Sequence, residues 1–443
     1  MAVRTDGPSR PPVTWKLATA SIIGNTIEFY DFTIYATLTA LVFTRLFFPA
    51  HDPLVGTLLS FGAFAAGFLA RPIGGIVFGH FGDRLGRRNT LMWSLGVMGV
   101  ATFLIGLLPT YASVGVTAPI LLTVLRVVQG FGIGGEWGGA VSLMVESAPP
   151  RRRGLYGSLV QTGSGLGIIL SSLTVSALLA FCTPAQLLAW GWRVPFLVSL
   201  VLVGVGVVVR WQISESPAFR ATAGRARAVK VPLWETLRRH PRNVLVATGL
   251  HVSDAAFGFL MGVFTISYVT NQLHLPNKIA VDMNLVGAVF YLVATVVGGA
   301  VSDRVGRRRA YLVFAALMIP AVFVFFWLLG LGSVPLLFVA GALAQTVLGL
   351  VYGIQAAFFS ELFSTEVRYS GISLGFQLAT VLGGALMPTI ASLLIASSGG
   401  ATWSVSVYIT VLVVITLVAT LAAKTVPVDG PRGAHHRTEE ATP

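Results

Sequence analysis

Residues 79–88 read Gly-His-Phe-Gly-Asp-Arg-Leu-Gly-Arg-Arg, and residues 299–308 read Gly-Ala-Val-Ser-Asp-Arg-Val-Gly-Arg-Arg. The two stretches share glycine, aspartate and arginine at six matching places, in the same order and at the same spacing. Each follows a long apolar run of the chain. Self-similarity at a fixed spacing indicates an internal repeat, so the sequence predicts two related halves.

Apolar residues make up 55% of the 443 residues and charged residues only 11%, whereas soluble proteins carry roughly a quarter charged residues. The solvent of this chain is therefore expected to be lipid. Apolar runs of about 20 residues can cross roughly 30 Å of hydrocarbon as helices. We predict twelve such spans, at residues 17–45, 54–79, 90–108, 118–146, 155–180, 194–211, 244–270, 284–301, 310–330, 334–361, 370–396 and 402–422.

The longest polar stretch, residues 212–243, separates six spans from six. A second element repeats around it, because Glu146 with Arg153 is matched by Glu361 with Arg368. The predicted fold is an all-α membrane protein with two parallel six-helix repeats and a substrate site between them near the midplane. The predicted segments are an N-terminal tail 1–16, a half 17–211, a central loop 212–243, a half 244–422 and a C-terminal tail 423–443.

The net charge of +13 at pH 7 is concentrated at alternate breaks between the spans. Basic residues gather near 84–88, 151–153, 210–242 and 304–309, and the intervening breaks hold almost none. This asymmetry follows the positive-inside bias, so we expect both termini and the central loop in the cytoplasm. The charge therefore needs no nucleic acid partner.

The only cysteine, Cys182, cannot form an internal disulfide. The sequence contains no His/Glu metal spacing and no nucleophile elbow. We expect no metal, no cofactor and no enzymatic activity.

The repeated loop resembles the hallmark loop of the major facilitator superfamily. Further segments resemble its metabolite:proton symporters, a bacterial branch that handles organic acids and osmolytes; they are residues 24–32, 71–75, 126–139 and 191–196. The resemblance covers residues 17–422 and implies a multi-pass protein of the bacterial inner membrane with an organic-acid substrate such as shikimate. One position departs from the family pattern, since His251 stands where the family has an arginine, and an imidazole can be neutral at pH 7.

Six ionisable residues lie well inside the predicted spans, where each charge costs roughly 2.5 to 3.5 kcal/mol and needs a partner, a cavity or a role. They are Glu28, Asp31, Arg71, Arg126, Glu136 and Asp254. These residues are the first candidates for the functional site.

Glu28 and Asp31 share one face of the first span, and Arg126 reaches a comparable depth from the outer side. We expect one of the two acids to face Arg126. An acid that exchanges partners can load and release a proton near neutral pH, which would couple protons to substrate. The alternative is a permanent ion pair that fixes the packing of the helices.

Arg71 and Glu136 lie at similar depths nearer the cytoplasmic end, and we expect them to form a second intramembrane pair with a structural or a functional role. Asp254 occupies the place of Asp31 in the second repeat and has no obvious cationic partner nearby in the sequence. It is a third candidate for proton coupling. The alternative is that it only bonds polar neighbours such as Ser253.

The candidate substrate ligands are polar side chains that could face a central cavity. A guanidinium binds a carboxylate with two parallel hydrogen bonds and keeps its charge. The candidates are Arg126, Gln129, Tyr35, His251 and Gln377.

The repeated loops are expected to close the cytoplasmic side, because their arginines can reach carboxylates at neighbouring helix ends. The resemblance implies that such pairs hold this side shut while the outer side is open; the alternative is that the arginines only set the topology. The expected gate comprises Gly79, Asp83, Arg84, Gly86, Arg87, Arg88, Glu146, Arg153, Asp303, Arg304, Arg307, Arg308, Glu361 and Arg368.

These features predict a secondary transporter that takes up a small organic acid, such as shikimate or a related carboxylate, together with protons by alternating access. Proton symport of a zwitterionic osmolyte such as proline or betaine is the alternative. A membrane receptor or a membrane enzyme would belong to a different functional class, and no motif in the sequence supports either. The expected partners are a small-molecule substrate, protons and the lipid bilayer, and we expect a monomer.

Overall fold

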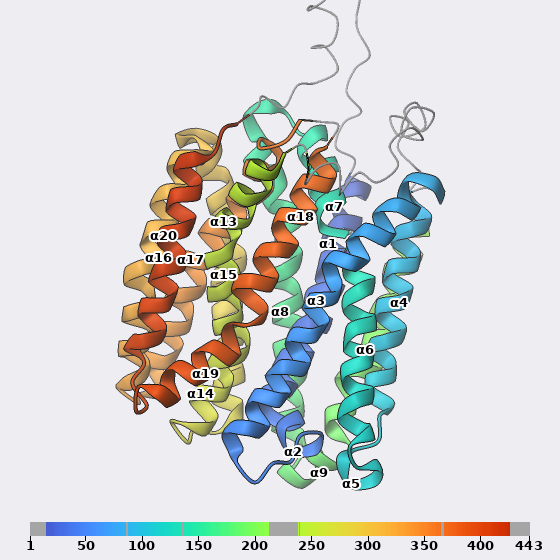
Figure 1. The fold of residues 1–443 in the computed structure, drawn as a ribbon, viewed down its shortest axis with the longest axis vertical. Helices are drawn as coiled ribbons and strands as arrows, with labels where there is room; N and C mark the ends of the chain where they lie inside the picture. The colour runs from blue at the N-terminus through green and yellow to red at the C-terminus, as the bar shows by residue number, and fades with distance from the viewer. Residues whose placement is uncertain are drawn as a thin grey trace, which may run out of the picture.

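The computed structural model describes residues 15–85, 87–134, 136–211, 238, 240–364 and 367–425. Most of the predicted central loop and both predicted tails lie outside the described residues. Helix is the only regular secondary structure in the part that is described, and the helices run roughly parallel in one bundle (Figure 1).

The first half of the chain contains helices with short connections between them. They are α1 (Trp15–Leu38), η1 (Thr39–Phe43), α2 (Thr44–Leu46), α3 (Pro53–Leu85), α4 (Arg87–Leu107), α5 (Tyr111–Val114), α6 (Thr117–Ile133), α7 (Glu136–Ser147), η2 (Pro150–Arg152), α8 (Arg153–Phe181), α9 (Pro184–Ala189), η3 (Gly191–Arg193) and α10 (Val194–Trp211).

The second half repeats this arrangement. Its helices are α13 (Pro241–Phe259), η4 (Leu260–Phe264), α14 (Thr265–Asn271), α15 (Asn277–Val305), α16 (Arg307–Gly330), α17 (Val334–Ser360), α18 (Arg368–Ala379), η5 (Thr380–Ala385), α19 (Met387–Ser397) and α20 (Trp403–Ala422).

Ten helical segments of the described residues are long and apolar enough to cross a membrane. The two remaining predicted spans also form helices, namely α1, which carries Glu28 and Asp31, and α4, whose apolar part is Met92–Leu107. The twelve predicted spans and the all-α fold of two six-helix repeats are confirmed.

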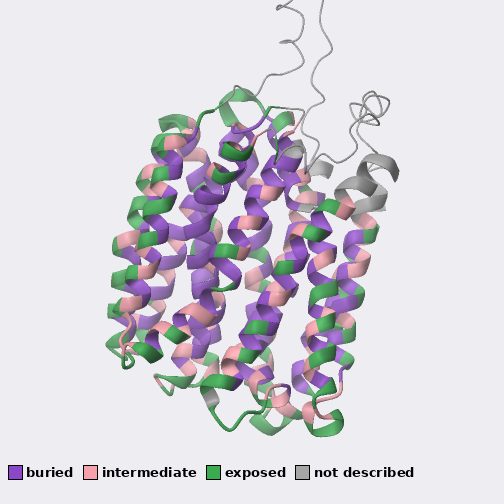
Figure 2. Ribbon diagram, in the orientation of Figure 1, coloured by how far each residue is buried: buried purple, intermediate pink, exposed green. Residues whose placement is uncertain are grey.

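The burial pattern fits a lipid environment. Buried residues gather inside the bundle and exposed residues on its outer faces (Figure 2), and many of the exposed residues are apolar. On α16 and α20, for example, Val313, Trp327, Val411 and Leu421 are more than half exposed. A water-soluble bundle would place polar side chains there, so these faces are suited to hydrocarbon.

Three described spans contain a π-helical turn, and two of these turns lie at equivalent places in the repeat. η1 interrupts the first span and η4 interrupts its counterpart in the second half. A π-helical turn breaks the regular i→i−4 ladder and often marks a functional region. Here the two turns are in contact across the boundary between the halves.

Helices α8 and α15 join the two halves along most of their length, side by side in Figure 1. Their backbones approach closely at Gly154 and Gly299, where a Cβ on Gly154 would lie 2.4 Å from the carbonyl oxygen of Gly299. Only a residue without a side chain permits this backbone contact. The two glycines therefore fix how closely the halves meet.

Candidate functional site

A cavity of about 100 Å³ lies between the two halves. This volume exceeds the roughly 10 to 15 Å³ that one water molecule needs, so the space can hold several waters or a small solute. Its charged lining consists of Glu28 from α1, Arg71 from α3, and His251 and Asp254 from α13. Each half thus contributes one acid and one basic group.

Arg71 and Glu28 form the ion pair of the first half. Arg71 Nη1 lies 3.4 Å from Glu28 Oε1, and both side chains are less than a tenth exposed. The guanidinium of Arg71 also lies over the ring of Phe68, 4.2 Å from its centroid. A cation–π contact helps to hold a buried cation.

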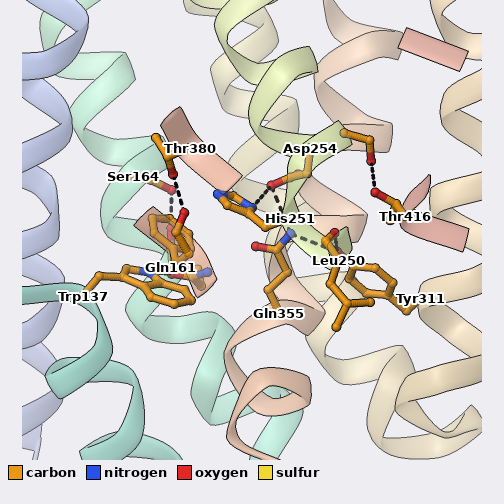
Figure 3. A network of polar contacts seen from close by, with 12 residues as sticks. Trp137, Gln161, Ser164, Leu250, His251, Asp254, Tyr311, Gln355, Thr380 and Thr416 are labelled. Carbon is orange, nitrogen blue, oxygen red and sulfur yellow. Dashed lines mark hydrogen bonds and ion pairs between the residues drawn. The ribbon is translucent and has the colours of Figure 1, made fainter. Parts of the chain in front are cut away.

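His251 and Asp254 form the corresponding pair of the second half. His251 Nδ1 lies 2.9 Å from Asp254 Oδ2, so Asp254 does have a basic neighbour. Gln355 Nε2 donates to the same carboxylate oxygen at 3.0 Å and lies 3.1 Å from the hydroxyl of Tyr311. Figure 3 shows His251 and Gln355 converging on Asp254.

The polar neighbour expected for Asp254, Ser253, points elsewhere. Its hydroxyl accepts a hydrogen bond from Thr416 on α20 at 2.8 Å. Neighbours along a helix project in different directions, and this decides the partner.

Three stacked rings connect the halves beside this pair. Phe376 of α18 lies between His251 and Trp137 of α7, with ring centroids 4.1 and 3.9 Å away. Trp137 Nε1 in turn donates to Gln161 Oε1 at 2.8 Å. All three rings line the cavity, so its wall is built from side chains that both halves supply.

Asp31 and Arg126 are linked by a relay and not by a direct ion pair. Thr102 donates to Asp31 Oδ2 at 2.9 Å, Gln129 donates to Thr102 at 2.7 Å, and Arg126 donates to Gln129 Oε1. The expected facing of Asp31 and Arg126 is therefore indirect. Thr102, a residue that the sequence did not single out, joins them.

Arg126 lies inside the first half and does not line the cavity. Its guanidinium is 4.0 Å from the ring centroid of Tyr35 and 5.2 Å from that of Phe64. The Tyr35 side chain is fully buried and its hydroxyl has no hydrogen-bond partner among the described residues. This cluster stabilises a buried cation without offering it to a solute.

Of the five expected substrate ligands, His251 alone lines the cavity among the described residues. Arg126, Gln129 and Tyr35 belong to the buried cluster. Gln377 makes a long contact of 3.4 Å to the carbonyl oxygen of Gly134. It therefore bridges α18 to the first half.

Carboxylates and arginines gather at the end of the bundle where α7 and α17 end, here called the arginine-rich end. Arg368 Nη1 donates to Glu146 Oε1 at 2.7 Å, across the boundary between the halves. Arg307 contacts Glu361 and, at 3.2 Å, Asp303. Loop arginines thus do reach carboxylates at neighbouring helix ends.

Asp303 also crosses the boundary between the halves. Its two carboxylate oxygens accept hydrogen bonds from the backbone N–H groups of Gly154 and Leu155, at 2.8 and 2.9 Å. These groups belong to the first turn of α8, where a negative charge is favoured by the helix dipole. The aspartate therefore caps α8 from the other half.

Burial raises the pKa of Glu361 above the usual value for a glutamate, and the positive charges of Arg307 and Arg153 oppose this shift. Arg153 is itself buried at the start of α8. Glu361 of the second half therefore experiences the charge of an arginine from the first half.

Not every expected gate residue joins these contacts. Arg304 is exposed, and no contact with a carboxylate is found for it in the described part of the chain, while Arg308 donates to the carbonyl oxygen of Leu421. The side chains of residues 79–91 lie outside the description. This range contains the expected gate residues Gly79, Asp83, Arg84, Gly86, Arg87 and Arg88. The side chain of Glu136 also lies outside the description, and the described partner of Arg71 is Glu28.

The cavity has further polar lining that the sequence did not single out. Asn284, Tyr291, Gln345 and Tyr352 come from α15 and α17. Each is a polar residue within a long apolar span, and this is the sequence feature that could have identified it as a candidate. Sequence spacing alone does not tell a cavity-lining side chain from one that bridges helices.

An all-helical bundle with apolar outer faces, two repeated halves and a charged cavity between them is the architecture of a multi-pass membrane transporter. The chain belongs to the major facilitator superfamily: the Major Facilitator Superfamily profile matches residues 21–376 and again residues 246–443. It is a transporter and not an enzyme.

Related sequences agree with this assignment. The chain is 42% identical over 411 residues to the "Inner membrane metabolite transport protein YhjE" of Escherichia coli (strain K12), which covers 92% of this chain and 93% of that protein. It is 40% identical over 397 residues to the "Shikimate transporter" of the same strain, with 89% and 91% covered. A "Proline/betaine transporter" of Salmonella typhimurium is 32% identical over 422 residues, with 92% and 83% covered.

Solved structures show the same fold. The "Partially occluded inward open conformation of the xylose transporter XylE from E. coli" superposes with a TM-score of 0.73 at 16% identity, covering 94% of this chain and 99% of that one. At this identity the likeness concerns the fold alone.

Proposed function

We propose that the protein takes up a small organic acid, such as shikimate or a related carboxylate, together with protons. The observation that carries the proposal is the cavity between the halves, which holds one acid–base pair from each half, Glu28 with Arg71 and Asp254 with His251. Buried charges within spans are costly, so their gathering around one cavity favours a transport role. The 40% identity to a shikimate transporter supports the substrate class.

The proposed alternating access would use the contacts between the two halves. At the arginine-rich end they meet through Arg368–Glu146 and through Asp303 on the first turn of α8. Beside the cavity, Phe259 of the second half packs against Phe32 and Phe68 of the first, and the π-helical turns η1 and η4 make a further contact between the halves. Opening one set of contacts at a time exposes the cavity to one side of the membrane.

The orientation is part of the proposal. The arginine-rich end and the tails would face the cytoplasm of a bacterial cell, with the bundle in the inner membrane, because basic residues favour that side. The name of the YhjE relative supports this location.

Three acids are the proposed proton carriers: Glu28, Asp31 and Asp254. Asp31 is fully buried, and its Oδ1 has no hydrogen-bond partner among the described residues. A carboxylate that is incompletely hydrogen-bonded away from water takes up a proton more readily.

Uptake of labelled shikimate into membrane vesicles under an imposed pH gradient tests the proposal. Concentrative uptake that collapses with a protonophore is the expected result, and uptake indifferent to the protonophore would rule out proton coupling. Among the three acids, loss of accumulation against a gradient in Glu28→Gln, Asp31→Asn or Asp254→Asn identifies the carrier. If Asp31→Asn still concentrates the substrate, Asp31 is not a proton carrier.

A zwitterionic osmolyte is the second candidate. The cavity is lined by Phe29, Phe32, Phe68 and Phe259, and aromatic faces attract quaternary ammonium groups. The proline/betaine relatives support this alternative. Betaine uptake in the same vesicles, with shikimate failing to compete, would favour it.

A further inference from the structure

We propose that Arg71, and not Arg126, binds the substrate carboxylate, and that Glu28 gives up Arg71 and takes a proton when the substrate arrives. This inference rests on the proposed uptake of an organic acid and names the site that performs it. It starts from the incomplete pairing of Arg71.

The ion pair between Arg71 and Glu28 leaves the guanidinium partly unsatisfied. A strong charge-assisted contact is about 2.7 to 2.9 Å long, and arginine often binds a carboxylate with two parallel bonds. Here the one Nη1 contact measures 3.4 Å, and the buried Nε of Arg71 has no hydrogen-bond partner among the described residues. A second carboxylate could therefore bind Arg71 better than Glu28 does.

Arg126 also has a buried Nε without a hydrogen-bond partner among the described residues, but it has no access to the cavity. It is absent from the lining of the cavity, and its guanidinium is engaged by Gln129 and by the ring of Tyr35. A substrate could reach it only after this packing had opened. Arg71 lines the cavity already.

The exchange keeps the charge of the cavity balanced. Before binding, the carboxylate of Glu28 neutralises Arg71. Afterwards the substrate carboxylate neutralises it, and Glu28 is neutral because it has taken one proton from water on the outer side. On release to the cytoplasm Glu28 loses that proton and pairs with Arg71 again, so one proton moves with each carboxylate.

Other titratable groups face the same space. They are His251 and Asp254 of α13, Tyr291 of α15 and Tyr352 of α17; α8 adds none from its described residues. His251 and Asp254 already contact each other, and the two tyrosines carry no charge near neutral pH. Among these groups, Glu28 is the acid whose partner, the guanidinium of Arg71, can pair with a substrate carboxylate instead.

The second half offers the complementary contacts. Gln345 Oε1 and Tyr352 Oη line the cavity region, are buried, and have no hydrogen-bond partner among the described residues. A buried polar atom without a partner costs roughly 1 to 3 kcal/mol, which a hydroxyl of the substrate could recover. A trimethylammonium group has no N–H or O–H to offer, so the lining favours a hydroxylated monocarboxylate.

The test measures shikimate binding to the purified full chain by calorimetry, with proton uptake followed by a pH indicator in weak buffer. The wild type should take up about one proton per bound shikimate near neutral pH. Glu28→Gln should still bind shikimate but take up no proton. Arg71→Gln should bind it about 10- to 100-fold more weakly, the range for losing a hydrogen bond to a charged group.

Arg45→Gln is the matched control, because Arg45 is exposed and is not among the residues that line the cavity. It should bind like the wild type. The double variant Glu28→Gln/Arg71→Gln leaves neither charge unpaired, so a thermal melt like that of the wild type checks that lost binding does not reflect misfolding. If Glu28→Gln still takes up a full proton, or Arg71→Gln binds normally, the inference is wrong.

Binding measurements on the wild type distinguish failure of this inference from failure of the proposed function. If it binds neither shikimate nor other carboxylates, the proposed organic-acid function fails. If it binds shikimate with proton uptake and the Glu28 and Arg71 variants behave like it, only the present assignment fails.

Tyr352→Phe tests the hydroxyl contact. It should weaken shikimate binding about 3- to 10-fold, as expected for one neutral hydrogen bond. Binding of cyclohexene carboxylate, which lacks the hydroxyls, should not change. An equal loss for both compounds would contradict a hydroxyl contact at Tyr352.

Discussion

Arg368 of the second half donates a 2.7 Å hydrogen bond to Glu146 of the first half, although each repeat contains its own glutamate and arginine. The matching residues of the other repeat interact electrostatically, since the charge of Arg153 in the first half acts to lower the pKa of Glu361 in the second. The repeated pairs are therefore exchanged between the halves. Such crossing turns a local motif into a latch that joins the halves.

Glu146→Gln should loosen this latch. Arg368 would keep a neutral acceptor, and because Glu146 is partly exposed the loss should be at most about 1 kcal/mol, or about fivefold in the opening equilibrium. Thiol labelling of Ser158→Cys in a Cys182→Ser background reports the opening, because Ser158 is buried against Gly299. Labelling should accelerate in the Glu146 variant.

Asp52→Asn is the control for that comparison, because Asp52 is an exposed acid that bonds only its own loop at Leu54. Its labelling rate should equal that of the parent. Equal rates in the Glu146 variant would mean that the pair does not hold the halves together.

Glu361 should make stability depend on pH in a definite direction. Its pKa is raised in the folded protein by burial, so between its ordinary pKa of 4.5 and the raised value the folded state holds a proton that the unfolded chain has lost. The free energy of unfolding therefore falls as pH rises through that window. Thermal melts in detergent from about pH 4.5 to 7 should show a shallower fall for Glu361→Gln. A slope unchanged by the substitution would contradict this assignment.

Gly353→Ala should destabilise the second half. A Cβ there would lie 1.9 Å from the carbonyl oxygen of Thr295, so α15 and α17 must separate, at a typical cost of about 1 to 3 kcal/mol. Gly204→Ala is the matched control on α10, since nothing lies within 4 Å of its Cβ. The control should be neutral or slightly stabilising because alanine favours helix. Similar melting temperatures for both variants would argue against this packing.

Thr102→Val should disturb the buried relay in the first half. The change removes the hydroxyl that donates to Asp31 Oδ2 and accepts from Gln129. Leaving these buried groups without a partner should cost about 1 to 3 kcal/mol. Thr102→Ser keeps the hydroxyl and serves as the control in denaturant titrations. Equal stability of the two variants would show that the hydroxyl is dispensable.

The sequence was sufficient to predict the fold. Twelve apolar runs, a repeated loop and a polar centre predicted two six-helix repeats, because the cost of burying peptide groups in lipid leaves helices as the spanning form. It also found the ionisable residues within the spans, since each charge stands out against an apolar background. Glu28, Arg71, His251 and Asp254 were all recognised in this way.

Their partners could not be read from the sequence. Asp31 and Arg126 lie at matching depths, yet Thr102 and Gln129 stand between them. Depth along a helix follows from a constant rise per residue, whereas the direction of a side chain depends on how the helix is rotated against its neighbours. Tertiary packing therefore decided that Arg71 faces the cavity and Arg126 does not.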